Sequence, residues 1–170
     1  MTTEQQVWTL LKNKQLTDIA TAAIMGNLFA ESSLRFNNVQ DACEKRVGGD
    51  TYYTQAIDNG NYSRSSFAND NVGYGIAQWT TDDRKAALYD LCKSKNKSIA
   101  DPQCQIDHLY NELKSRGLVN RMNAAGSILD ASNIFLVYFE APADQSQAVK
   151  NIRAEFGQKY YNDLKNTKIK

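Results

Sequence analysis

Glu31 is the residue whose type and position best suit acid chemistry. It follows Ala20, Ile24 and Leu28 at steps of four, four and three, which places all four side chains on one face of a helix. That face is apolar until its last member. A carboxyl group held against apolar packing loses the hydration of its anion, so its pKa rises and it can protonate a leaving group near neutral pH. The spacing therefore predicts a general acid, although a glutamate at a helix end is more often a solvated surface residue.

Several helices are predicted around this one. Thr17 is a plausible N-cap for the helix that carries Glu31. Other helices are expected over residues 4–12, 82–92, 102–116 and 130–139, and in a segment whose apolar face is Val149, Ile152, Phe156 and Tyr160.

Residues 35–80 have a different character. They are rich in Asn, Asp, Gly, Ser and Tyr, and they contain turn signals and no long helical pattern. We therefore expect a single α+β domain over residues 1–170 that is mostly α-helical. It would have a small irregular or β-containing lobe at about 35–80, a helical lobe at about 81–164, and Glu31 at the edge of a cleft between them.

Composition excludes several classes of function. The 20 basic and 19 acidic side chains give a formal net charge of +1, which argues against nucleic-acid binding as the main task. No apolar run is long enough to span a membrane, and the first residues do not form a secretory signal peptide. No spacing of His and Cys suggests a metal site, and we expect no cofactor. The three cysteines, Cys43, Cys92 and Cys104, are expected to be free thiols.

Five segments resemble the phage tail lysozyme family in type and order: Gly26–Arg35, Ala56–Gly60, Gly73–Thr80, Tyr138–Pro142 and Arg153–Tyr161. Each is short, but the resemblance as an ordered set extends over nearly the whole chain, from about Leu16 to Leu164. The Glu31-Ser32 pair and the later Gly-Ile-Ala-Gln run are also similar to those of goose-type lysozymes and lytic transglycosylases. One departure is Phe36, which stands where the family often has proline.

The resemblance implies a lysozyme-like, two-lobed fold and cleavage of the bond between MurNAc and GlcNAc in peptidoglycan, with Glu31 as proton donor. It also implies a protein that acts on the bacterial wall, either carried on a phage tail with other tail components or released by host lysis.

Glycoside hydrolysis usually takes two carboxylates. Asp58 is the first choice for the second one, because the Asp58-Asn59-Gly60 turn could present it to the cleft. Alternatively, Asp58 caps its own turn. Asp70 is the next candidate, ahead of Asp50 and Glu44.

Residues of the Gly73–Thr80 segment would bind substrate. Gln78 would position the sugar or a water molecule, and Gly75 would let the backbone approach the glycan closely. Tyr74, Trp79 and Tyr138 could pack against sugar rings, but Trp79 could equally belong to the core, and Tyr138 could lie on a buried helix.

Other readings remain open. A lytic transglycosylase acting on the same bond needs no second carboxylate. A cysteine peptidase of the wall would use Cys43 with His108, the single histidine. A non-catalytic tail or wall-binding module is the third alternative.

Overall fold

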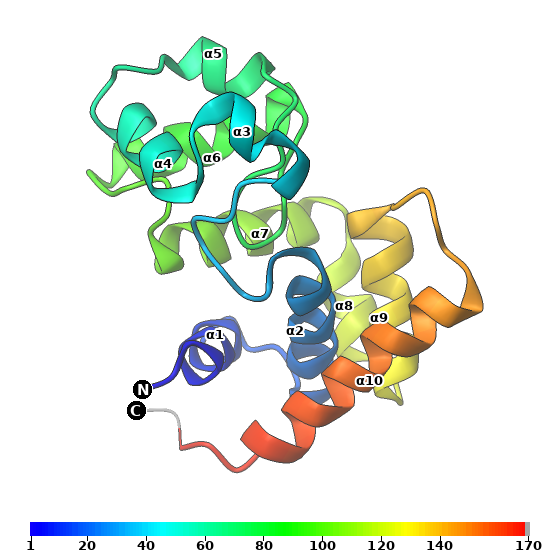
Figure 1. Cartoon of the computed structure of the whole chain (residues 1–170). Helices are drawn as coiled ribbons and strands as arrows, with labels where there is room; N and C mark the ends of the chain where they lie inside the picture. Colours follow the sequence, from blue (N-terminus) through cyan, green and yellow to red (C-terminus); the bar gives the residue numbers. More distant parts are fainter. Residues whose placement is uncertain (169–170) are drawn as a thin grey trace. The chain divides into compact units, whose positions relative to one another are not determined.

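The computed structural model describes residues 1–168, and these residues form mainly helices (Figure 1). The chain divides into two compact units, Met1–Leu34 with Tyr110–Lys170, and Arg35–Leu109. The expected β structure in the polar lobe is not found. In the described residues, β pairing is limited to two isolated antiparallel bridges, Val39 with Tyr74 and Tyr74 with Trp79.

The first unit contains α1 (Thr3–Lys12), α2 (Asp18–Ser32), α8 (Leu118–Asn123), α9 (Ile128–Phe135), the π-helix η2 (Leu136–Glu140), α10 (Gln147–Leu164) and the end of α7 (Pro102–Ser115). Helix α2 packs against α1, α9 and α10 (Figure 1). The helix expected at 130–139 is present as α9 followed by η2, so its second half is a π-helix.

Helix α2 is the core of this unit. Thr17 caps it as predicted, with Oγ1 accepting from the Ala20 N–H at 3.1 Å. Residues 20–28 are all buried, so the expected single apolar stripe understates the burial of this helix. A helix that is apolar on every side belongs in a core. The small residues of α2, such as Ala22, Ala23 and Gly26, leave room for neighbours on each side.

Two glycines bring α2 and α10 into close contact. A Cβ on Gly26 would lie 2.4 Å from the carbonyl oxygen of Arg153 and 2.5 Å from the amide nitrogen of Gly157. A Cβ on Gly157 would lie 3.0 Å from the carbonyl oxygen of Ala22. Only glycine allows the two backbones to approach this closely, and this contact fixes which face of α10 meets α2.

The buried face of α10 differs from the prediction. The buried residues are Arg153, Gly157, Tyr160 and Leu164. Ile152, expected on that face, is 50% exposed. The apolar spacing was misleading because the true face includes an arginine, which must be buried beside Glu31, and a glycine, which has no side chain to register as apolar.

The second unit contains η1 (Asp41–Cys43), α3 (Glu44–Val47), α4 (Asp50–Asp58), α5 (Arg64–Asn69), α6 (Asp82–Ser94) and the start of α7. The polar segment is thus built from short helices. Helix α6 packs against α5, so it shares a unit with the polar segment, whereas the sequence placed it in the helical lobe. The aromatic rings of Tyr53, Phe67 and Tyr74 pack together, with the Phe67 and Tyr74 centroids 5.8 Å apart.

Candidate active site

Glu31 lies in the last turn of α2, where the helix ends at a left-handed Ser33 (φ 54°). Its side chain is 22% exposed, and Oε1 accepts a hydrogen bond from Nη2 of Arg153 at 2.6 Å. Within residues 1–168 this is the hydrogen-bond partner of the carboxyl group, so Oε2 is not engaged. The sequence predicted apolar surroundings for Glu31, and that prediction was incomplete because it missed the cation.

Arg153 is itself held in place. Its side chain is 10% exposed, and Nη1 donates to Oδ1 of Asn27 at 3.4 Å. Asn27 is fully buried on α2, and its Nδ2 donates to the carbonyl oxygen of Ala23 at 2.9 Å and to Oγ of Ser132 at 3.0 Å. Polar groups from α2, α9 and α10 therefore form one connected network that ends at the Glu31 carboxyl.

Asp70 is buried in an ion pair. Its side chain is 6% exposed, and Oδ1 lies 2.5 Å from Nζ of Lys85, which is 0% exposed. Oδ1 also accepts the Val72 N–H at 2.9 Å, and Oδ2 accepts the hydroxyls of Tyr53 and Tyr62. Each oxygen is thus occupied by more than one donor, an arrangement suited to holding the second unit together.

The same cluster shifts the pKa of its members. Burial lowers the pKa of Lys85, with Asp70 opposing that effect. Burial, together with the hydrogen bond to Asp70, raises the pKa of Tyr53. The Lys85 ammonium also lies 4.3 Å from the centre of the Phe67 ring and donates to the Val72 carbonyl at 2.8 Å. The burial of Lys85 was not predicted from the sequence, since a lysine on a helix is normally a surface residue.

Asp58 is the last residue of α4, before the left-handed Gly60 (φ 83°). Its Oδ1 accepts the Ile99 N–H at 2.9 Å, and its Oδ2 accepts the Ser98 hydroxyl at 2.5 Å. The carboxylate therefore joins α4 to the loop before α7, in place of capping its own turn. These contacts are structural, and a catalytic role for Asp58 or Asp70 stays a prediction.

The Gly73–Thr80 segment forms a compact turn. Gly75 (φ 82°) and Gln78 (φ 53°) both adopt left-handed conformations, and Gln78 Nε2 donates to the carbonyl oxygens of Asn38 (2.9 Å) and Gly75 (3.0 Å). Tyr74 and Trp79 are fully buried. The Tyr74 hydroxyl lies 2.7 Å from Oγ1 of Thr54. This favours the core interpretation of the two aromatic residues over contact with sugars.

Gln105 supports this turn and was missed from the sequence. It is fully buried on α7, and its Oε1 accepts the Ile76 N–H at 2.9 Å. Its Nε2 donates to the carbonyl oxygens of Phe36 (2.6 Å) and Ile99 (2.8 Å). One amide thus joins three loops of the second unit. No local pattern distinguishes it from an ordinary helical glutamine.

Tyr138 is exposed, whereas Tyr74 is buried. Tyr138 lies in η2, is 52% exposed, and has the Arg121 guanidinium 4.4 Å from its ring centre. A short π-helix is rare and frequently marks a functional site. Of the three aromatic residues predicted to bind substrate, Tyr74 and Trp79 are buried, whereas Tyr138 has an exposed ring that a ligand could reach.

The alternative cysteine mechanism gains no support. The sulfur of Cys43 contacts Gln40 and Arg46, and neither is a general base. His108 is 5% exposed, and its ring centre lies 4.9 Å from that of Trp79. All three cysteines are free thiols. Among residues 1–168 no group of three or more His, Cys, Asp or Glu side chains could hold a metal ion.

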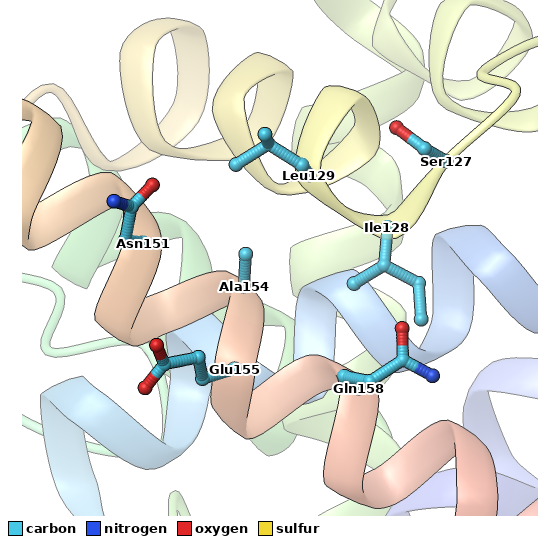
Figure 2. A pocket seen from close by; sticks show the side chains of 7 residues that line it. All are labelled: Ser127, Ile128, Leu129, Asn151, Ala154, Glu155 and Gln158. Carbon is cyan, nitrogen blue, oxygen red and sulfur yellow. The ribbon is translucent and has the colours of Figure 1, made fainter.

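A surface hollow of about 330 Å³ lies between the start of α9 and α10 (Figure 2). Its lining residues are Ser127, Ile128, Leu129, Asn151, Ala154, Glu155 and Gln158. Asn151, Glu155 and Gln158 are exposed, whereas Arg153 faces the core from the other side of α10. The hollow is therefore separate from the Glu31 carboxyl.

The sequence profile of the phage tail lysozyme family matches residues 2–164. The chain belongs to this family. As a phage tail lysozyme it is a lysozyme-like enzyme of cell-wall lysis, and its substrate is peptidoglycan. No curated protein matches the chain significantly. In the part of the chain that the structure describes, no helix is long and apolar enough to cross a membrane.

Proposed function

We propose that the protein is a muramidase that cleaves the β-1,4 bond between MurNAc and GlcNAc, with Glu31 as general acid. The observation that carries the proposal is the setting of Glu31 in a lysozyme-family chain. The carboxyl is 22% exposed, one oxygen is fixed by a buried arginine, and the other is not engaged by residues 1–168.

The proton balance is simple. Protonated Glu31 gives its proton to the glycosidic oxygen, the bond from that oxygen to C1 of MurNAc breaks, and GlcNAc leaves with a free 4-hydroxyl. Water then adds at C1, and its proton returns to the Glu31 carboxylate. The products are a reducing MurNAc end and a regenerated acid.

Other residues have proposed supporting roles. Tyr138 offers its exposed ring to the glycan, while Gln78 and Gly75 shape the turn of the Gly73–Thr80 segment. Asp58 and Asp70 are the candidates for a second carboxylate, although their hydrogen bonds favour structural roles. The protein would reach the wall on the virion tail, beside other tail components, or after host lysis.

The test replaces Glu31 with glutamine, which keeps the shape of the side chain but cannot donate the proton. General acid catalysis typically contributes about 10²–10⁴-fold, so Glu31→Gln, assayed at a temperature where it is folded, should lower the wall-lytic rate by a factor in that range. Glu155→Gln is the matched control, because Glu155 is exposed on α10. A Glu31→Gln variant within about tenfold of the wild type would refute the proposal.

Mass analysis of the digested wall identifies the reaction. Reducing MurNAc ends support a muramidase, anhydro-MurNAc ends indicate a lytic transglycosylase, and an unchanged wall indicates a non-catalytic module. Asp58→Asn and Asp70→Asn, assayed where each is folded, decide whether a second carboxylate takes part. If both retain activity and Glu31→Gln has none, the mechanism has a single protein acid.

A further inference from the structure

We propose that Arg153 is a positioning residue for Glu31: its guanidinium holds Oε1 and leaves Oε2 to face the scissile bond. The inference rests on the proposed function of Glu31, and it adds a second residue to that function. Arg153 does not touch the reacting atoms, so it would act only through the carboxyl group that it binds.

The contact between Arg153 and Glu31 joins one guanidinium nitrogen to one carboxyl oxygen. Nη2 of Arg153 lies 2.6 Å from Oε1 of Glu31, a distance typical of a short charge-assisted hydrogen bond. Nη1 points to Asn27, which is anchored in turn to Ser132. Because the guanidinium is planar, fixing one of its ends by Asn27 also fixes the direction from which Nη2 approaches the carboxyl.

The position of Glu31 on its helix favours a cationic partner. Glu31 lies at the carboxyl end of α2, where the partial negative charge of the helix disfavours a carboxylate. No basic residue occurs in the last turn of α2 to offset it. The compensating charge comes instead from α10, across the close contact of Gly26 with the backbone of α10.

An ion pair with little access to water is weak evidence for a stabilising role, because desolvation opposes the attraction between the charges. A catalytic role accounts better for this pair. When Glu31 releases its proton it becomes an anion, and the guanidinium stabilises that anion without having to move. The same contact keeps Oε2 aligned for the returning proton.

The experiment compares Arg153→Met, which keeps the aliphatic packing, with Arg153→Lys, which keeps the charge. Lys159→Met is the control, because Lys159 makes an exposed ion pair with Asp163 on the same helix. The substrate is soluble, uncross-linked peptidoglycan strands, new reducing ends are counted, and kcat and KM are determined separately at a temperature where each variant is folded.

Arg153→Met should lower kcat by about 10- to 100-fold. The upper figure is the effect of misplacing a catalytic group by about 1 Å. KM should change much less, because the arginine acts in the transition state and not in substrate binding. Arg153→Lys should recover part of kcat, and Lys159→Met should match the wild type. In a Glu31→Gln background, Arg153→Met should cause no further loss.

Two results would overturn the inference. One is an Arg153→Met kcat within about threefold of the wild type, below what loss of a positioned group costs. The other is an Arg153→Lys variant that is folded but no more active than Arg153→Met. If Glu31→Gln itself stays active, the proposed function fails first. If Glu31→Gln is inactive and Arg153→Met is normal, only the role of Arg153 fails.

Discussion

Replacing Lys85 with methionine tests how strongly the second unit is destabilised when the buried Asp70 carboxylate loses its cation. The ammonium is 0% exposed and has three acceptors, namely Asp70 Oδ1 at 2.5 Å, the Val72 carbonyl at 2.8 Å and the Tyr53 hydroxyl at 3.2 Å. Methionine fills a similar volume but supplies no charge and no donor. The Asp70 carboxylate, 6% exposed, would then be buried without its cation.

The expected loss is large relative to the stability of the fold. Removing one partner of a buried ion pair typically costs about 3–5 kcal/mol. A domain of this size has an unfolding free energy of roughly 5–15 kcal/mol, and its melting temperature falls by about 2–4 °C per kcal/mol. Lys85→Met should therefore lower the melting temperature by about 6–20 °C.

Thermal unfolding followed by circular dichroism measures this effect, with denaturant titration as a second estimate of the free energy. The double variant Lys85→Met/Asp70→Asn should recover part of the loss, because no unpaired charge is then buried. Arg64→Met, which breaks the exposed pair with Asp90, should change little. A Lys85→Met variant that loses less than about 1 kcal/mol, a loss typical of surface pairs, would contradict the reasoning.

Two further predictions concern the helix contact and the tyrosines. Gly26→Ala should lower the free energy of unfolding by about 1–3 kcal/mol and also reduce lytic activity, because its Cβ would lie 2.4 Å from a backbone oxygen of α10. Gly126→Ala is the control, because a Cβ at that position would have no atom within 4 Å. Equal melting temperatures for the two variants would argue against the close contact. Burial raises the pKa of Tyr53 and Tyr74, and raises that of Tyr160 to about 12. The unfolded chain ionises its tyrosines near pH 10 while the folded chain keeps these three neutral, so stability should fall as the pH rises from about 10 to 12. Absorbance at high pH should show tyrosines that ionise only on unfolding, and a single tyrosine transition near pH 10 in the folded protein would contradict this.

Local signals predicted the helix of Glu31 well. Thr17 caps α2 through an N–H only three positions away, and the apolar steps from Ala20 to Leu28 mark buried positions. Both depend on neighbours within a few residues, which a sequence pattern can record. The family resemblance, carried by several ordered motifs, was confirmed over residues 2–164.

The partners of the acidic residues could not be read in this way. Arg153 lies 122 positions after Glu31, and Lys85 lies 15 positions after Asp70. A charged residue on a helix is normally exposed, so neither cation was expected to be buried or to pair with an acid, although Arg153 begins one of the segments that resemble the family. Asp58 was predicted either to be the second carboxylate or to cap its own turn, but its partners, Ser98 and Ile99, are about 40 positions away.

The expectation of β structure in the polar segment was not met, for a related reason. The Tyr- and Thr-bearing pieces of the polar segment, such as Thr51 to Thr54, were expected to be either short strands or short helices, and their composition suits strands. In the structure they lie in α4, where Tyr53 faces the buried aromatic cluster and the exposed Tyr52 does not. Intrinsic strand preference was outweighed by packing against Phe67 and Tyr74.

The separation of Glu31 and Arg153 along the chain has a consequence for synthesis. A ribosome completes α2 long before it adds α10, so a growing chain carries the acid without its guanidinium until Gln147–Leu164 has emerged and docked. With Arg153 acting as proposed, chains that lack a docked α10 would have a reduced kcat. Full activity would then require that α10 has closed against Gly26.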